Sequence, residues 1–408
     1  MGTNRPDLAE RGRTMTFVDI LVVLLVIAAA ISGYRQGFIT AMFTLVTAIA
    51  GAIAAIQLAP LLMELVDDST AKIAIGIACV VAGVGIGEVA GSTVGKAISK
   101  RISWRPAQAV DRTLGLFGYS IAVLIVIWLI AVPLASVPFP WLSSAIRGSA
   151  VLAKVNEAMP AQAQDVSARL REVFNDSGFP AILDPLAPTP NTSVDPPDPA
   201  VASTQQVAAA GASIVKVRAV AESCSRRMEG TGFVIGPGKV MTNAHVVAGS
   251  NRAGVEVDGE TLEGTVVLYD AQRDLAVVDV PELTAPALTF AAQEAQEGAD
   301  AIVAGYPLDG PYTLTPARVR SVIQLRGPNI YSSSTVTREV VTLRAQVRPG
   351  NSGGPLLAPD GTVLGVIFGA AIDEPDVGFA LTAAEVAPVV ESGLADDSAA
   401  STEACTAA

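Results

Sequence analysis

Four long apolar stretches in the first third of the chain constrain its fold more than any other feature. They span about residues 16–33, 38–63, 73–94 and 115–137. Each is close to or above the roughly 20 residues that a helix needs to cross the hydrocarbon core of a bilayer. The first has the short basic start of a secretory signal, but three further spans follow directly. We therefore predict a polar tail, residues 1–15, and a four-helix transmembrane domain in the lipid bilayer, residues 16–137.

The third stretch carries a repeated glycine and one carboxylate. Every fourth position is glycine, at Gly83, Gly87, Gly91 and Gly95. At helical spacing these glycines form a smooth stripe where another helix can approach closely, and we interpret it as packing within the bundle rather than between chains. Glu88 lies in the same stretch, and a carboxylate at membrane depth indicates function. A transporter with Glu88 as its relay is one candidate, unless Glu88 lies near the helix end or beside a neutralising group.

Basic residues in the connections predict the orientation of this domain. The third connection is the most basic, with Lys96, Lys100, Arg101, Arg105 and Arg112. The first carries Arg35, whereas the second carries Glu64, Asp67 and Asp68 and no basic residue before Lys72. Because cytoplasmic loops are enriched in Lys and Arg, we expect connections one and three in the cytoplasm and both termini outside. Three arginines in the first 15 residues argue for the opposite orientation.

Residues 138–205 are predicted to link two domains. The pattern of residues 140–178 indicates amphipathic helix, with Leu152, Val155, Ala158 and Met159 on one face and a second piece at 166–174. We expect these helices on the membrane surface or against the following domain. Six prolines between residues 185 and 199 then predict an extended, semi-rigid spacer.

From residue 206 the pattern changes to short apolar runs broken by Gly, Asp and Asn. Examples of the expected strands are residues 213–220, 232–235, 255–257, 264–268, 275–280, 301–304, 340–343 and 363–368. Turns at this spacing predict an all-β barrel or sandwich. One short helix is expected at 383–391, and the lack of strand–helix alternation argues against a parallel α/β sheet. This domain covers residues 206–395, and a tail follows at 396–408.

Ser352 is the candidate nucleophile of this domain, in the loop GNSGGP. The glycines let a substrate carbonyl approach main-chain N–H groups closely. A Ser hydroxyl becomes a good nucleophile when a base takes its proton, and His245 is the only histidine in the chain. Asp274 opens an apolar strand and is the best candidate to orient His245. Its competitors, Asp258 and Asp270, lie in polar surroundings and are interpreted as solvated turn residues.

The order of the three candidates selects between protease folds. Residues 350–354 satisfy the G-x-S-x-G pattern of α/β-hydrolases, but that fold needs a histidine after the serine. The subtilisin order needs the aspartate first, on a parallel-sheet fold. The order His245, Asp274, Ser352 and the β-rich pattern together predict a double β-barrel serine protease. The predicted fold class is thus an all-α transmembrane domain followed by an all-β double barrel.

Three pieces of this domain carry a family resemblance. Residues 230–235 (GTGFVI) lead to 242–247 (TNAHVV), followed by 274–277 (DLAV) and 350–355 (GNSGGP). Together they resemble the trypsin-like serine proteases of the bacterial HtrA style, although no PDZ-like region follows. The segment at residues 33–38 (GYRQGF) resembles the colicin V production (CvpA) family. The combination is similar to a family of actinobacterial membrane proteases and covers nearly the whole chain.

The resemblance implies a periplasm-facing serine endopeptidase that needs no metal or cofactor. It implies cleavage of cell-envelope proteins and support of survival under acid and oxidative stress. In this fold the backbone N–H groups of Gly350 and Ser352 form the oxyanion hole. The specificity pocket is expected to be lined by two stretches, with Gln346, Val347, Arg348, Ile367 and Phe368 as candidates. No acidic residue precedes Ser352 in its stretch, which argues against a preference for Arg or Lys.

The three cysteines are too few for a disulfide-rich scaffold. Cys79 lies in an apolar segment and is interpreted as a packing residue, which leaves Cys224 and Cys405 as a pair or as two thiols. The family resemblance implies that they form a disulfide. A disulfide needs an oxidising compartment, which agrees with a protease domain outside the cytoplasm.

Net charge and linker exposure bear on the partners of the chain. The net charge is −12, and residues 138–408 hold 17 basic against 31 acidic residues, which argues against a nucleic-acid partner. Protein or peptide substrates are expected instead, and the proline-rich spacer is an expected site of self-cleavage. The alternative to an enzyme is a catalytically silent, protease-fold peptide sensor coupled to the membrane domain. The complete triad counts against that alternative.

Overall fold

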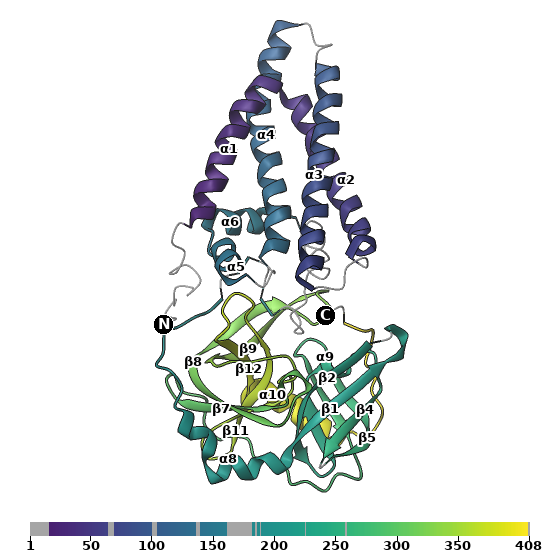
Figure 1. Ribbon diagram of the computed structural model, residues 1–408, viewed down its shortest axis with the longest axis vertical. Coiled ribbons are helices and arrows are strands. Elements are labelled where there is room, and N and C mark those ends of the chain that lie inside the picture. The colour runs from purple at the N-terminus through teal and green to yellow at the C-terminus, as the bar shows by residue number, and fades with distance from the viewer. Residues whose placement is uncertain are drawn as a thin grey trace, which may run out of the picture. The chain divides into compact units, whose positions relative to one another are not determined.

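The computed structural model describes residues 16–63, 69–99, 104–135, 139–160, 182–183, 186–187, 189–224, 226–257 and 259–406. They form two compact units, a helical unit in the first part of the chain and a β-rich unit that includes everything from Thr189 onward (Figure 1). The predicted polar tail, the acidic residues of the second connection and the predicted helical piece at 166–174 lie outside the described residues.

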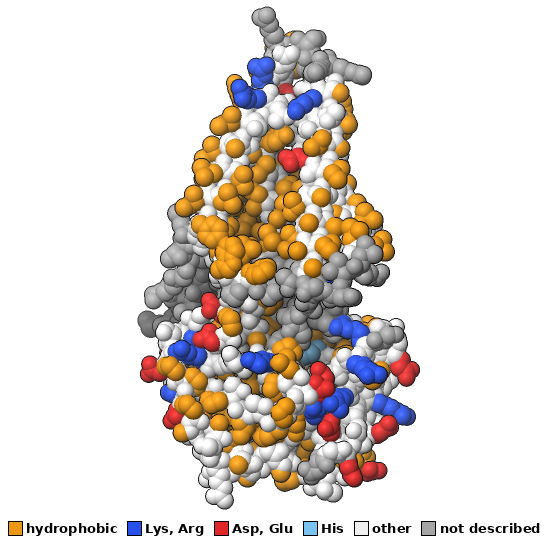
Figure 2. Space-filling model, viewed as in Figure 1, with side chains coloured by type: hydrophobic (Ala, Val, Ile, Leu, Met, Phe, Trp, Pro, Cys, Tyr) orange, Lys and Arg blue, Asp and Glu red, His pale blue; other side chains and the backbone are white. Residues whose placement is uncertain are grey.

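Long apolar helices make up most of the helical unit. They are α1 (Phe17–Gln36), α2 (Phe38–Met63), α3 (Ser69–Ser99) and α4 (Arg105–Leu134). Their most apolar windows have a mean hydropathy between 1.9 and 2.5. Hydrophobic side chains cover the visible face of these helices (Figure 2), far more than a soluble surface exposes. The four spans predicted from the sequence are confirmed, and α3 and α4 extend beyond their apolar stretches.

The glycine stripe of α3 faces α2. A methyl group added at Gly87 would lie 2.1 Å from the carbonyl oxygen of Thr47, and one at Gly91 would lie 2.5 Å from that of Phe43. Gly83 and Gly95 meet the same helix. The stripe therefore brings two backbones of one bundle together. Glu88 is exposed on α3.

A single glycine joins α1 to α2. Gly37 has a φ of +87°, a conformation that side-chain-bearing residues rarely adopt. A methyl group there would lie 1.8 Å from Oδ2 of Asp111. The other carboxylate oxygen of Asp111 accepts a hydrogen bond of 3.1 Å from the amide of Ile39 at the start of α2. The last glycine of the 33–37 segment is thus required both by the turn and by the carboxylate that approaches it.

Two short helices, α5 (Pro140–Arg147) and α6 (Ala150–Ala158), pack against the long ones. Leu152 on the predicted apolar face is fully buried. The indole of Trp128 in α4 donates to the Asn156 side chain at 3.0 Å, and Ser149 donates to Asp19 of α1 at 2.6 Å. Buried apolar side chains of α5 and α6 thus pack within the bundle, whereas Trp141 of α5 is exposed; a place at the membrane surface stays a prediction.

The β-rich unit contains two closed antiparallel barrels of six strands (Figure 1). The first is built from β1 (Ile214–Ala221), β2 (Arg226–Gly236), β3 (Lys239–Thr242), β4 (Arg252–Val257), β5 (Glu260–Asp270) and β6 (Leu275–Asp279). The second is built from β7 (Asp300–Gly305), β8 (Thr313–Pro328), β9 (Thr335–Arg344), β10 (Pro355–Leu357), β11 (Val363–Ala370) and β12 (Val377–Thr382). The predicted chymotrypsin-like double barrel is confirmed.

Helices and turns connect and flank these strands. They are η2 (Pro199–Ser203), α8 (Gln205–Ala210), η3 (Gly211–Ser213), η4 (Glu222–Cys224), α9 (Ala244–Val247), η5 (Pro307–Asp309) and α10 (Ala383–Ala395). Each barrel encloses its own apolar core. Helix α10 follows the second barrel in sequence and packs on both barrels. A side chain at its Gly393 would meet Val277 of β6 within 2.5 Å.

The proline-rich segment at residues 189–198, here called the strap, binds the second barrel. Arg320, Arg344 and Arg318 of β8 and β9 donate to carbonyl oxygens of the strap at 2.6, 2.7 and 3.1 Å. The acceptors are the alternate residues Thr192, Val194 and Pro196. The strap is extended, as predicted for this segment, and an extended chain presents every second carbonyl to a row of arginines. The sequence did not predict that it would be bound along the second barrel.

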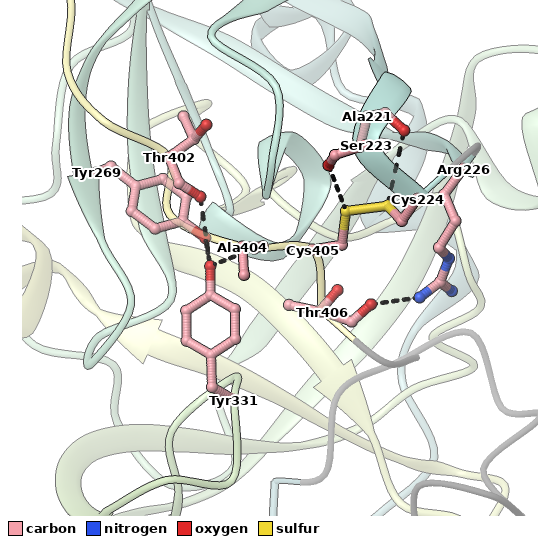
Figure 3. Close-up of a disulfide and its surroundings, with 10 residues drawn as sticks. All are labelled: Ala221, Ser223, Cys224, Arg226, Tyr269, Tyr331, Thr402, Ala404, Cys405 and Thr406. Carbon is pink, nitrogen blue, oxygen red and sulfur yellow. Dashed lines mark hydrogen bonds between the residues drawn. A yellow bond between two sulfur atoms is a disulfide. The ribbon is translucent and has the colours of Figure 1, made fainter.

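The C-terminal tail returns to the first barrel and ends in a disulfide. The amide of Ala400 donates to Val266 of β5 at 2.8 Å. Cys405 is bonded to Cys224 in η4, the pair that the family resemblance implied. Around the disulfide, the Tyr331 hydroxyl donates to the carbonyl of Ala404 at 2.7 Å (Figure 3).

Candidate active site

His245 and Asp274 lie side by side on the first barrel. Helix α9 presents His245 directly after β3, and Asp274 immediately precedes β6. Nδ1 of His245 lies 2.7 Å from Oδ2 of Asp274. The main-chain N–H of His245 also donates to Oδ1 at 3.0 Å. A carboxylate at Nδ1 favours the tautomer that carries its proton there and leaves Nε2 free to accept one.

Asp274 is held in an unusual conformation to make this contact. Its φ is +63°, in the left-handed region, which is uncommon for any residue with a side chain. The amide group of Asn243 donates to its carbonyl at 2.7 Å, and its side chain is fully buried. Of the competing aspartates, Asp270 instead binds the side chain of Arg273 at 3.1 Å, whereas Asp258 lies outside the described residues.

The loop around Ser352 belongs to the second barrel. The carbonyl of Pro349 accepts from the Leu308 amide at 2.7 Å, and the carbonyl of Asn351 accepts from Gly354 at 2.9 Å. In a trans peptide the N–H points opposite to the C=O, so the amides of Gly350 and Ser352 point away from these contacts. Across the part of the chain that the structure describes, neither amide has a hydrogen-bond acceptor. This is the arrangement that two oxyanion-hole donors require.

Close packing puts the loop of Ser352 beside the segment of His245. A methyl group at Gly230 would lie 2.6 Å from Val246 and 2.9 Å from the carbonyl of Ser352. The structure therefore brings the three sequence-predicted residues to one region between the barrels. The hydroxyl of Ser352 makes no hydrogen bond within the described residues, to His245 or to any other. Such contacts often tighten only when substrate binds.

The candidate pocket residues fall into two groups. Gln346 and Arg348 are exposed, and Arg348 donates to the side-chain oxygen of Gln346 at 3.3 Å. Val347 and Ile367 instead lie in the core of the second barrel, and Phe368 is fully buried against Phe379, with 6.4 Å between ring centroids. The structure thus places interior side chains at three of the five positions predicted to line a pocket, because β11 is covered on both faces.

What β11 offers to the site is its backbone. The amide of Gly353 donates to the carbonyl of Ile367 at 2.8 Å, and the amide of Ile367 donates to the carbonyl of Gly354 at 2.9 Å. These bonds join the strand to the loop that follows Ser352. No cluster of three or more His, Cys, Asp or Glu side chains suited to a metal occurs among the described residues.

Thr231 was not singled out by the sequence analysis, although it lies in the GTGFVI piece. The amide of Thr231 donates to the carbonyl of Ser352 at 2.8 Å. Its hydroxyl donates to the carbonyl of Gly350 at 2.6 Å. No property of the sequence alone marks it, because both partners lie more than a hundred residues away.

Comparison with known proteins agrees with this architecture. Residues 230–366 match the family of the trypsin-like peptidase domain, and residues 18–160 match that of the colicin V production protein. Fold and site together define a serine endopeptidase of the trypsin-like class on a multi-pass membrane domain. Over 285 residues the chain is 50% identical to serine protease Rv3671c of Mycobacterium tuberculosis, which covers 69% of this chain and 72% of that protein. The chain belongs to this family of serine proteases.

One solved structure and one further relative add to this comparison. The crystal structure of the active form of Rv3671c protease superimposes with a TM-score of 0.52 at 50% identity, over 55% of this chain and 100% of that one. The putative serine protease HhoB of Synechocystis is 36% identical over 157 residues, 37% of each chain.

Proposed function

We propose that this serine protease cleaves cell-envelope proteins outside the cytoplasm, with His245, Asp274 and Ser352 as its triad. The observation that carries the proposal is the 2.7 Å contact between Nδ1 of His245 and the buried carboxylate of Asp274. The free amides of Gly350 and Ser352 support it. A protease fold that only binds peptides has no need of an oriented histidine beside two unused donors.

Each residue has one role in the proposed reaction. Ser352 Oγ attacks the carbonyl carbon of the substrate, and His245 Nε2 takes the hydroxyl proton. Asp274 stabilises the imidazolium that forms, while the amides of Gly350 and Ser352 bind the negative oxygen of the tetrahedral intermediate. His245 then gives the proton to the leaving amine as the peptide bond breaks. Water attacks the acyl group on Ser352 in the same way and releases the second product.

Labelling with a fluorophosphonate probe tests the triad against the sensor alternative. We expect the full-length protein in detergent to be labelled at Ser352, and the His245→Ala and Ser352→Ala variants to remain unlabelled. Ser392→Ala is the control, since Ser392 is exposed on α10 and donates only within its own helix. An unlabelled but folded wild type would support the silent sensor.

The proposed location outside the cytoplasm rests on two observations. The first and third connections carry all basic residues of the membrane domain except Lys72, and the Cys224–Cys405 disulfide belongs to an oxidising compartment. Protease added to intact spheroplasts should digest a tag fused after residue 408. A tag that is digested only after lysis would reverse the orientation.

A role in resistance to acid and oxidative stress completes the proposal. It is supported by the family resemblance and by the disulfide that joins the C-terminal tail to the first barrel. Cells that lack the protein should lose viability in acid and in peroxide, and the wild-type gene should restore it. If Ser352→Ala restores viability equally well, proteolysis is not the protective activity.

Self-cleavage in the proline-rich linker is a further part of the proposal. The described strap is bound by three arginines, so a cut within it requires release of those contacts. Purified wild type should yield two fragments on storage, whereas Ser352→Ala should stay intact. Fragments in the Ser352→Ala protein would assign the cut to another protease.

A further inference from the structure

Thr231 in β2 ties the nucleophile loop to two other segments. It is fully buried, and each of its polar groups is used. Its N–H donates to the carbonyl of Ser352 at 2.8 Å, and its hydroxyl donates to the carbonyl of Gly350 at 2.6 Å. The hydroxyl also accepts from the amide of Tyr306 at 3.0 Å. Its carbonyl accepts from the Thr242 hydroxyl at 2.8 Å.

The direction of the hydroxyl proton follows from these contacts. A threonine hydroxyl has one proton and two lone pairs. Because the Tyr306 amide is a donor, it must occupy a lone pair. The carbonyl of Gly350 can only accept, so the Thr231 proton points to it. The amide of Tyr306 thus fixes the direction in which Thr231 donates.

This hydroxyl completes a row of four restrained carbonyls in the nucleophile loop. The carbonyls of residues 349 and 351 accept from the amides of Leu308 and Gly354, and that of residue 352 accepts from the amide of Thr231. The carbonyl of Gly350 accepts from the Thr231 hydroxyl, the one side-chain donor in the row. A main-chain donor survives any ordinary substitution, whereas this contact depends on residue type.

Gly350 is a glycine directly before the 350–351 peptide, and its backbone conformation does not depend on a side chain. Its φ is +91°, and glycine can leave this region without steric cost from a side chain. Rotation at Gly350 would carry the peptide between residues 350 and 351 with it and shift the amide of Ser352. The hydrogen bond from Thr231 opposes this rotation, because rotation would leave the Gly350 carbonyl and the Thr231 hydroxyl proton unpaired in the interior.

We propose that the Thr231 hydroxyl is a positioning group of the oxyanion hole. It holds the Gly350 carbonyl, so that the amides of Gly350 and Ser352 stay aimed at the oxygen of the tetrahedral intermediate. Thr231 touches neither substrate nor reacting atoms, and it acts through the main chain. This inference rests on the proposed triad mechanism and adds to it the residue that keeps the two donors together.

Thr231→Val tests the hydroxyl at nearly constant shape. Removing one oxyanion donor costs about 10²–10³ in kcat, so loss of its positioning group should lower kcat by about 10- to 100-fold. KM for a peptide substrate should change less than about threefold, because the donors bind the intermediate more strongly than the ground state. The affinity for a peptide aldehyde, whose adduct carries the negative oxygen, should fall in parallel with kcat. Thr231→Ser keeps the hydroxyl and should retain most of the activity.

Two controls separate this role from a general loss of stability. Thr342→Val removes another fully buried hydroxyl, one that donates to Ser321 in the second barrel. It should lower the unfolding midpoint as Thr231→Val does and leave kcat within about threefold of wild type. If Thr231→Val does not fold, Thr231→Cys replaces it, since a thiol of similar size is a weak donor. Its kcat should lie well below that of Thr231→Ser.

The outcomes distinguish this inference from the proposed function. A wild type without Ser352-dependent hydrolysis would overturn the triad mechanism itself. An active wild type with equal kcat in folded Thr231→Val and Thr231→Ser would overturn the positioning role alone. A rise in the KM of Thr231→Val with unchanged kcat would also overturn the positioning role. If Thr231→Val does not fold, equal activity of Thr231→Cys and Thr231→Ser would overturn it.

Discussion

Asp274 contacts His245 from a strained backbone conformation. Its left-handed conformation is of a kind that costs about 1–3 kcal/mol for a residue with a side chain. The conformation brings both carboxylate oxygens to the Nδ1 and main-chain N–H of His245. The strained backbone of Asp274 is thus the conformation in which its carboxylate fixes the orientation of the His245 imidazole.

Replacement of this carboxylate is the sharpest test at the residue scale. Asp274→Asn should lower kcat by about 10⁴-fold, because an amide can hold the imidazole in the wrong tautomer and does not stabilise the imidazolium. Asparagine tolerates the left-handed region, so the unfolding midpoint should stay close to wild type. Asp270→Asn is the matched control and should keep its activity. An Asp274→Asn enzyme within tenfold of wild type would remove Asp274 from the triad.

Glu374 gives a pH-dependent prediction at the same scale. It lies between β11 and β12, where burial raises its pKa above the ordinary value of 4.5, and the charges of Asp373 and Asp376 raise it further. The folded state binds this proton more tightly than the unfolded chain. The stability that protonation gives is therefore full below pH 4.5 and is lost as pH rises through the folded-state pKa.

Glu374→Gln removes the charge and should act as the permanently neutral form. At neutral pH its denaturant midpoint, followed by pulse proteolysis of the β-rich unit, should exceed that of wild type. The difference should vanish as pH falls below 4.5. Glu391→Gln on the exposed side of α10 should show no such trend. A midpoint of Glu374→Gln at or below wild type at neutral pH contradicts the prediction.

At the element scale, the glycine stripe sets how closely α2 and α3 approach. Gly87→Leu should disrupt this contact, because even a methyl group would lie 2.1 Å from the carbonyl of Thr47. We expect less folded protein in detergent and a lower thermal midpoint, read from the fluorescence of Trp128, which is buried in the bundle. Gly85→Leu on the same helix is the control, since nothing lies within 4 Å of its added carbon. Equal midpoints for the two variants would mean that the helices do not depend on the stripe.

The sequence predicted elements where one local property was enough. Long apolar runs revealed the spans, and the unique histidine with the residue order revealed the catalytic candidates. It failed where tertiary contacts decide. Strands β8 and β10 are not among the examples predicted, because Pro316, Arg318 and Arg320 in β8 are typical of loops and β10 is only three residues long. The contacts of Thr231 and the burial of the β11 side chains could not be predicted, because they exist only once the two barrels are folded.

At the scale of the whole molecule, the disulfide closes a loop between residues 181 positions apart. Chain entropy gives an upper figure of roughly 5 kcal/mol for such a loop. Cys405→Ala should therefore lower the denaturant midpoint of the β-rich unit strongly, as should reduction of wild type. Pulse proteolysis reports this unit, while the fluorescence of Trp104, Trp128 and Trp141 reports the helical unit.

Cys79→Ala is the control for that experiment, since Cys79 is the unpaired cysteine of the described chain. Cys79→Ala should leave the denaturant midpoint of the β-rich unit unchanged. Reduction should lower the midpoint of this variant as much as it lowers that of wild type. Equal midpoints for oxidised wild type and Cys405→Ala would show that the disulfide adds nothing to the stability of the β-rich unit.

The strap and the tail of the β-rich unit each bind the barrel that is more distant from them in sequence. The strap precedes the first barrel in sequence but is fastened to β8 and β9 of the second. The tail follows the second barrel but is fastened to the first through Val266 and Cys224. A pull on the strap from the membrane side is therefore borne by the barrel that carries Ser352. The segment that leads from the strap into the first barrel therefore carries no load. Force on the strap does not separate Ser352 from His245.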